Sequence, residues 1–268
     1  MKIKEVIESI LNYHPQLGNS ITCDGYRCGN EQDEVTGIVT TCCASVDVIR
    51  QAIRMGANLI ICHEPVFYSH YDPTDWLEGK NHVFDAKKKL CTENGIAIWR
   101  DHDHIHARHP DGINEGIMKE LGWEQYLIGD PDRPSHFHIP QTTVRTLALM
   151  LKEKVQLNGV RIVGNLDAQV SYVMLYYHIL ANGDDFIPTE LLNRDDVDVL
   201  IPGEMVDWTT ASYARDAGQL GMKKAIINIG HFNMEELGMK YAATWISKLI
   251  NNCVPVTFVP SADMYQFL

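Results

Sequence analysis

One stretch of the chain reads as a strand, a helix and a second strand in direct succession. Residues 37–43 are β-prone, and Ser45 is a candidate cap for a helix that Gly56 would end. The short apolar run 58–62 follows at once. Such a unit predicts two parallel strands joined by a right-handed crossover, and it commits this part of the chain to a layered α/β fold.

The same alternation continues along the chain and predicts an α/β protein with largely parallel sheets. Residues 127–140 hold three prolines and little apolar periodicity, so they are the expected linker between two similar halves, 1–126 and 141–268. Helices are expected at 3–11, 45–55, 83–93, 113–121, 142–153, from about 188, at 208–219 and 234–250, and further strands at 96–99, 159–163, 171–180, 197–201, 225–229 and 254–259.

Composition narrows the function classes. Hydrophobic residues make up 45% of the chain, which can fill a real core, and the net charge of −12 disfavours binding to nucleic acid phosphates. No run approaches the length of a membrane span, and the N-terminal segment lacks the apolar stretch of a signal peptide. The seven cysteines include no CxxC pair and are expected to be reduced thiols. We therefore expect a soluble cytoplasmic protein.

Three polar clusters follow predicted strands, where ligands of open α/β sheets gather. The first is His63-Glu64, where a turn after the strand would let both side chains converge. In the second, alternation places His102, His104 and His106 on one face if that stretch is extended. In the third, His231 and Glu235 are four residues apart and share one helix face. Taken singly, each cluster has an ordinary alternative, such as a solvated loop, a surface pair or a chance spacing.

Taken together, the clusters supply at least three imidazoles and two carboxylates. This inventory fits two divalent ions that share a carboxylate, as in hydrolases where two metals stabilise the attacking and leaving oxygens. Imidazole-rich ligation favours Zn or Fe over Mg, and Mn stays open. We expect two divalent ions per chain.

The order of four blocks resembles the NIF-three-like dinuclear metal centre family, often labelled GTP cyclohydrolase I type 2, in its short form without an inserted middle domain. The blocks are GANLIICHEP at 56–65, IAIWRDHDHIHA at 96–107, IPGE at 201–204 and GHFNMEE at 230–236. The resemblance implies two similar α/β domains, a toroidal homohexamer and a dinuclear centre. Carried over position by position, the implied ligands are His63, Glu64, His106, His231 and Glu235.

Two of these positions depart from the family pattern in a complementary way. Glu64 stands where the family has the second histidine of its HHP motif, and His106 stands where it has the aspartate of HTNLD. The set still holds three histidines and two acids, so we interpret the pair as a compensated exchange. An imidazole offers one nitrogen to one ion, so bridging would fall to a carboxylate. Our hypothesis is that Glu235 bridges, with His63 and His106 on one ion and Glu64 and His231 on the other.

The resulting hypothesis is a metal-dependent hydrolase in which His102 or His104 serves as general acid or base. The substrate would be a small molecule: opening of a purine nucleotide ring, as the cyclohydrolase label suggests, or hydrolysis of a phosphoester or amide. The alternative is a non-catalytic metal-binding or interaction scaffold. The expected partners are further copies of the chain and the substrate, without nucleic acid or membrane.

Overall fold

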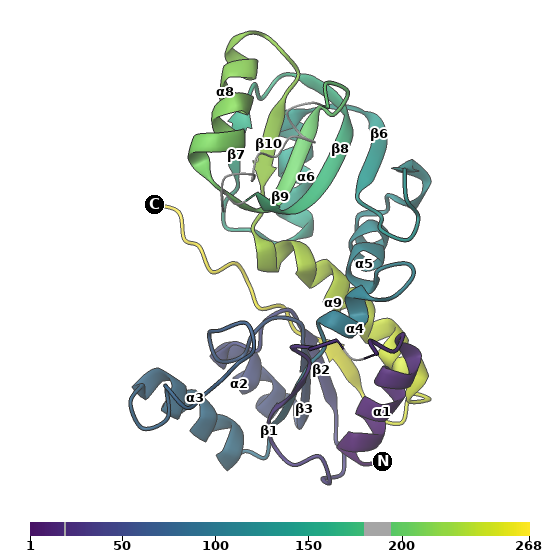
Figure 1. Ribbon diagram of the computed structural model, residues 1–268, viewed down its shortest axis with the longest axis vertical. Coiled ribbons are helices and arrows are strands. Elements are labelled where there is room, and N and C mark those ends of the chain that lie inside the picture. Colours follow the sequence, from purple (N-terminus) through teal and green to yellow (C-terminus); the bar gives the residue numbers. More distant parts are fainter. Residues whose placement is uncertain (19, 180–193) are drawn as a thin grey trace. The chain divides into compact units, whose positions relative to one another are not determined.

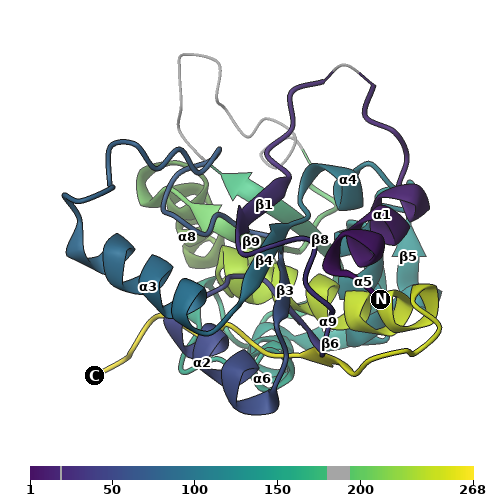
Figure 2. The same ribbon diagram turned by 90° about the horizontal axis from the view of Figure 1, so that it is seen from below.

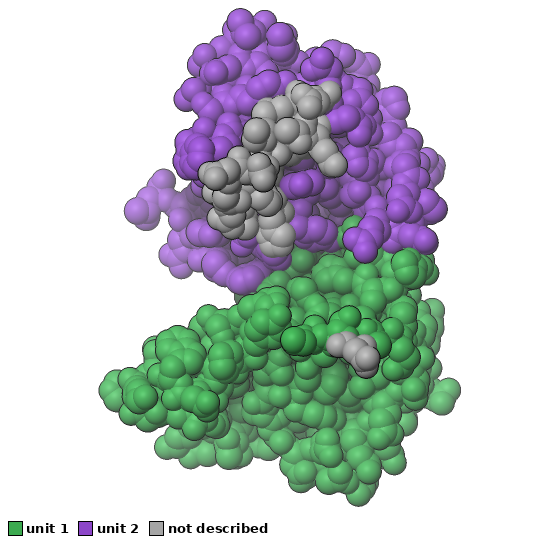
Figure 3. All heavy atoms as spheres, in the orientation of Figure 1, with its two compact units in different colours: residues 1–116, 235–261 green, residues 117–234, 262–268 purple. Residues whose placement is uncertain are grey.

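The computed structural model describes residues 1–18, 20–179 and 194–268 (Figure 1). The chain forms two compact units (Figure 3). Unit 1 comprises residues 1–116 and 235–261, and unit 2 comprises residues 117–234 and 262–268. Each unit is built around its own sheet.

Unit 1 contains a five-stranded sheet. In spatial order its strands are β1 (Gly25–Cys28), β4 (Ala97–Arg100), β3 (Leu59–Cys62), β2 (Ile38–Thr41) and β11 (Val256–Phe258). The four strands from β4 to β11 are parallel, and β1 is antiparallel to β4. The central strands are buried at every position, which is why they read as continuous apolar runs.

The helices of unit 1 cover both faces of this sheet. In Figure 2, α2 (Val46–Met55) and α3 (His82–Glu93) lie on one side of β3 and β4, and α1 (Ile3–Tyr13) lies on the other. The core beneath α2 and α3 joins Val48 and Ile49 to Phe84 and Ile60. The predicted caps are confirmed: the Ser45 hydroxyl accepts from the amide of Val48, and Gly56 is left-handed with φ of 71°. The remaining helices of the unit are α4 (Asp103–His106), the start of α5 (Gly112–Leu121) and most of α9 (His231–Leu249).

Unit 2 contains a six-stranded mixed sheet. Its strands in spatial order are β5 (Leu127–Ile128), β6 (His136–Thr143), β8 (Gln169–Ile179), β9 (Val199–Met205), β10 (Ala225–Asn228) and β7 (Arg161–Gly164). Among the described strands of this unit, only β8, β9 and β10 pair in parallel. Among the described residues of the unit, the helical elements are the end of α5, the 3-10 turn Glu124–Tyr126, α6 (Val144–Lys154), the π-helical turn Asp207–Ala211, α8 (Ser212–Gln219) and the start of α9.

The α/β architecture with two sheets agrees with the sequence-based prediction. The expectation of largely parallel sheets holds for unit 1 but is wrong for unit 2, where three of the strand pairs are antiparallel. The expected division of the chain also differs in two places. The segment 127–140, expected as a linker, contributes β5 and the first residues of β6 to the sheet of unit 2. Residues 235–261, expected in the C-terminal half, belong to unit 1, because β11 pairs in parallel with β2. The helix expected from about 188 begins outside the described residues. Within the described ranges, no helix combines the length and the apolar composition that a membrane crossing requires.

Candidate metal centre

The first two polar clusters begin where strands of unit 1 end. His63 and Glu64 follow β3, and both of their amides donate to the carbonyl oxygen of Cys42, at 3.0 and 2.9 Å. This arrangement turns the chain and leaves both side chains buried. Asp101 follows β4, and its amide donates to the carbonyl of Cys62 at 2.8 Å. The parallel register of β3 and β4 therefore brings the two clusters to one edge of the sheet.

Three imidazoles meet at this edge. One ring nitrogen each from His63, His102 and His106 lies within 4.8 Å of the others. The rings of His63 and His102 stack with centroids 4.5 Å apart, and the ring of His106 stands edge-on to both, at 4.9 and 5.0 Å. Imidazoles gathered in this way suit a transition metal.

Each of these rings has its Nδ1 held by an oxygen. Nδ1 of His63 donates to the carbonyl oxygen of Asp101 at 3.1 Å, and Nδ1 of His106 lies 2.8 Å from Oδ2 of Asp111. Nδ1 of His102 lies 3.0 Å from Oδ1 of Asp103. Histidines that bind metals almost always carry such a partner on the second ring nitrogen, because it fixes the tautomer and the direction of the ring.

Two carboxylates also lie close to His63. Ligand atoms of His63, Glu64 and Glu235 also lie within 4.8 Å of one another, and Nε2 of His63 is 3.5 Å from Oε2 of Glu235. A guanidinium nitrogen of Arg100 lies 3.7 Å from Oε2 of Glu64. We call the five residues His63, Glu64, His102, His106 and Glu235 the His63 cluster.

One buried nitrogen without a hydrogen bond indicates whether the His63 cluster is suited to a metal ion. Nε2 of His63 is buried and makes no hydrogen bond, although its Nδ1 does. A buried ring nitrogen without a hydrogen-bond partner lowers the stability of the fold unless another group, such as a metal ion, binds it. The donor set around it, imidazoles with carboxylates, is the one that Zn, Fe and Mn accept. The residues therefore fit the ion that the sequence predicts.

The electrostatics of the cluster point the same way. Burial lowers the pKa of His63, but the carboxylates of Glu235 and Glu64 outweigh burial and raise that pKa to about 9. Burial lowers the pKa of His102 to about 4, with help from the neighbouring imidazoles of His63 and His106. The carboxylates thus favour a positive charge at His63, which a bound cation would supply.

The expectation that His102, His104 and His106 share one face is wrong, because the stretch is helical and not extended. In α4, His102 and His106 are one turn apart and both join the His63 cluster. His104 instead places Nδ1 2.6 Å from Oδ2 of Asp24 and belongs to a group with Asp24 and Asp101. His102 and His104, the two candidates for general acid or base, therefore lie in different groups.

His231 belongs to unit 2, where it is the first residue of α9. Its Nδ1 lies 3.7 Å from Oε1 of Glu204, and its ring centroid is 6.3 Å from that of Tyr177. With Glu204 and Gly203 it lines a pocket of about 530 Å³ in that unit. Glu235 follows one turn later on α9 and belongs to unit 1. The role of His231 as a ligand stays a prediction.

Three aspartates that support these histidines escaped the sequence analysis. Asp24 accepts from the amides of residues 102, 103 and 104 and so builds the start of α4. Asp101 and Asp111 hold His63 and His106 in the manner described. Spacing gave a weak signal for Asp111, five residues after His106, whereas Asp24 comes from a distant part of the chain.

Comparison with known proteins decides the family. The sequence profile of Duf34/NIF3 (NGG1p interacting factor 3) matches residues 1–263. The chain belongs to the Duf34/NIF3 family. The resemblance inferred from the motifs is thereby confirmed.

Curated relatives of this Duf34/NIF3 chain include two proteins named GTP cyclohydrolase 1 type 2 homolog. The one from Clostridium acetobutylicum is 25% identical over 247 residues, which is 88% of this chain and 85% of the relative. The one from Clostridium perfringens is 24% identical over 246 residues, with 88% and 87% covered. The crystal structure of a Bacillus cereus protein related to NIF3 shares the fold, with a TM-score of 0.72, 16% identity and coverage of 100% and 99%.

The two departures from the Duf34/NIF3 motif pattern fall inside the His63 cluster. Glu64 and His106 both have ligand atoms near His63, each in one of the two overlapping groups. His106 also keeps a carboxylate close, since Asp111 binds its Nδ1. This placement supports the hypothesis that the exchange is compensated within one centre.

Proposed function

We propose that the His63 cluster binds divalent transition-metal ions and that the protein is a metal-dependent hydrolase. The observation that carries the proposal is Nε2 of His63, which is buried without a hydrogen bond among two further imidazoles and two carboxylates. Membership of a family whose curated relatives are named GTP cyclohydrolase 1 type 2 homolog supports it. We propose two ions per chain, drawn from Zn, Fe and Mn.

The residues divide the work of such a centre. When bound, divalent ions supply Lewis-acid chemistry that polarises a carbonyl or phosphoryl oxygen. Glu235 and Glu64 would provide the negative charge that holds the ions, and Glu235 would be the carboxylate that they share. His63 and His106 provide neutral nitrogens whose direction is set by the Asp101 carbonyl and by Asp111.

Proton transfer falls to His102 in this proposal, and the other four residues of the cluster would hold the ions. Its lowered pKa keeps the imidazole neutral at pH 7, so it is able to accept a proton. The carboxylate of Asp103 at Nδ1 would stabilise the imidazolium that results. His104 lies in a different group, with Asp24 and Asp101, so we do not assign proton transfer to it.

The proposed substrate class is a small molecule with a hydrolysable carbon or phosphorus centre. The printed names of the relatives favour ring opening of a purine nucleotide, and phosphoester or amide hydrolysis is the second choice. The family description, an interacting factor, favours one rival, a metal-binding scaffold without turnover. We also propose the toroidal homohexamer, which light scattering on the purified protein would test as a sixfold multiple of the chain mass.

The deciding experiment compares Glu235→Gln with Glu236→Gln. The metal content of both purified variants is measured, and both are screened against nucleotides, phosphoesters and amides with Zn, Mn and Fe. We expect Glu235→Gln to lose bound metal and hydrolysis together. Glu236→Gln should keep both, because its remaining carbonyl oxygen can still accept from the Ser261 amide.

Two outcomes would count against the proposal. Hydrolysis that persists in Glu235→Gln would show that the cluster is not the catalytic centre. Bound metal in the unmodified protein without turnover of any substrate class would favour the scaffold.

A further inference from the structure

A second group of metal-ligand type residues lies beside the His63 cluster in unit 1. Asp24, Asp101 and His104 each place one ligand atom within 4.8 Å of the others. None of the three belongs to the His63 cluster. We propose that this group, which we call the Asp24 group, is an accessory binding site for one divalent cation.

Burial separates this group from an ordinary acidic surface patch. The side chain of Asp101 is 1% exposed and that of Asp24 is also 1% exposed, while that of His104 is 15% exposed. Two carboxylates removed from water in this way are costly unless positive charge or hydrogen bonds compensate them. The question is therefore which atoms of the group already have a partner.

Asp101 supplies the observation that points to a ligand. Its Oδ2 lies 3.0 Å from Nε2 of His14, but its Oδ1 is buried and has no hydrogen-bond partner. The His14 contact orients the carboxylate and leaves Oδ1 as the atom that needs a partner. An imidazole that orients a carboxylate ligand is a common outer-shell arrangement in metal sites.

Asp24 and His104 provide the other side of the site. Oδ1 of Asp24 accepts from the amides of His102 and Asp103, and Oδ2 accepts from the amide of His104, all between 2.7 and 2.9 Å. These bonds fix the carboxylate in place. Nδ1 of His104 lies 2.6 Å from the same Oδ2, so the two atoms share a proton.

The chemistry of the donors indicates the class of ion. Two carboxylates with one imidazole are richer in oxygen than the His63 cluster, so the Asp24 group should favour Mn²⁺ more than the His63 cluster does. The two sites would be linked through one residue, because the carbonyl oxygen of Asp101 holds Nδ1 of His63. An ion on the carboxylate of Asp101 would therefore steady a residue that orients the first site.

The experiment removes the first site and counts what remains. Mn²⁺ is titrated into a His63→Ala/Glu235→Gln variant, with the bound ion measured by electron paramagnetic resonance. We expect one Mn²⁺ per chain with a nitrogen coupling from one imidazole. Adding His104→Ala should remove the coupling and weaken binding at least about tenfold. Adding His109→Ala, which deletes an exposed imidazole three residues after α4, should change neither.

Asp101→Asn in the otherwise unmodified chain gives a second measurement, since it keeps the carbonyl that holds His63. It should lower the total Mn²⁺ content by one ion per chain, and this arm covers the case in which the double variant does not fold. The inference fails if the double variant binds no Mn²⁺, or if His104→Ala and Asp101→Asn both leave the Mn²⁺ content unchanged. Either result would mean that Asp24, Asp101 and His104 form a hydrogen-bond network that binds no ion. A His104-dependent ion in a protein without hydrolase activity would leave this inference standing while the proposed function fails.

Discussion

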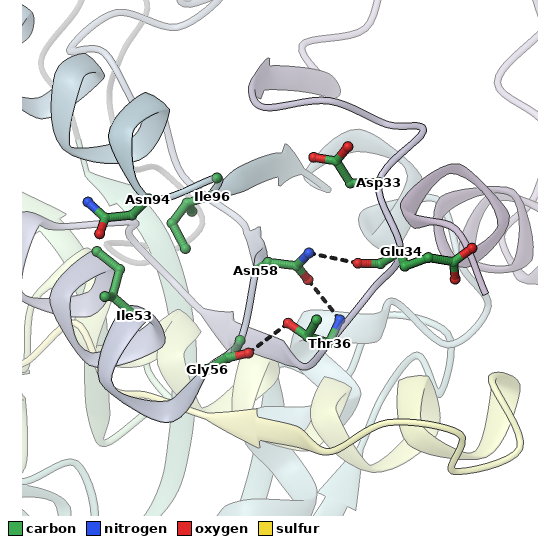
Figure 4. A pocket seen from close by; sticks show the side chains of 10 residues that line it. Asp33, Glu34, Thr36, Ile53, Gly56, Asn58, Asn94 and Ile96 are labelled. Carbon is green, nitrogen blue, oxygen red and sulfur yellow. Dashed lines mark hydrogen bonds between the residues drawn. The ribbon is translucent and has the colours of Figure 1, made fainter.

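The two ends of the parallel strands in unit 1 are both lined by polar side chains, yet they differ in how those side chains are satisfied. At the amino-terminal end, residues that precede β2, β3 and β4 line a pocket of about 480 Å³ (Figure 4). There, Nδ2 of Asn58 donates to the carbonyl of Glu34 at 2.8 Å, and its Oδ1 accepts from the amide of Thr36 at 2.9 Å. The Thr36 hydroxyl donates to the carbonyl of Gly56 at 2.6 Å.

At the carboxyl-terminal end, hydrogen bonding is incomplete where the side chains are most buried. Nε2 of His63 and Oδ1 of Asp101 have no hydrogen-bond partner. The pocket at the amino-terminal end therefore lies where Asn58 and Thr36 have hydrogen-bond partners. Unsatisfied buried ligand atoms mark the end where chemistry is expected.

The largest effect should come from His63→Ala. This change removes the one residue that both ligand groups of the cluster share, so we expect metal affinity to fall by more than about 100-fold and hydrolysis to be lost. Calorimetric metal titration and the substrate screen measure the two effects. His138→Ala, an exposed histidine of unit 2, is the control. If His63→Ala kept its metal affinity, the carboxyl-terminal end of the sheet would not be the metal-binding end.

Asp111→Asn should have an intermediate effect. An asparagine keeps Oδ1, which accepts from the amides of Ile113 and Asn114, but it replaces the oxygen that binds Nδ1 of His106. We expect metal affinity to fall by about 10- to 100-fold with little change in the melting temperature. The same change at Asp130, which accepts from the amide of Asp132 in a turn, should leave metal affinity unaltered. Equal affinity in both variants would mean that His106 is not a ligand.

Asn58→Ala tests the other end of the sheet. It removes two hydrogen bonds to the backbone, so the free energy of unfolding should fall by about 1–3 kcal/mol. Urea denaturation measures the loss, and metal affinity should stay within twofold of the unmodified chain. A loss of metal binding larger than the loss of stability explains would show that the amino-terminal end also carries function.

Thr36→Val should have the smallest effect. The threonine is exposed and its hydroxyl makes one hydrogen bond, to the carbonyl of Gly56. We expect about 0.5–1 kcal/mol of lost stability, seen as a shift of the urea midpoint at constant slope. A changed slope of the unfolding free energy against urea concentration would indicate that Thr36 affects more than this one hydrogen bond.

Local pattern predicted much of this protein. Apolar runs and helix periodicity located the central strands of unit 1 and the helices that cover them, because those strands are buried on both faces and those helices on one. The cap at Ser45 and the left-handed Gly56 were predicted from residue type alone. The motifs also identified His63, Glu64, His106 and Glu235, and the structure brings these four side chains into overlapping groups.

Tertiary structure alone decided how the parts combine. The carboxylate of Asp24 gathers three amides at residues 102–104 and makes α4 helical, which parts His104 from His102 and His106. The pairing of β11 with β2 returns residues 235–261 to unit 1 and carries Glu235 with them. Both outcomes depend on contacts between distant segments. Periodicity shows only which side of a helix or strand is buried. The sequence therefore identifies candidate metal ligands, and long-range contacts determine which of them lie close together.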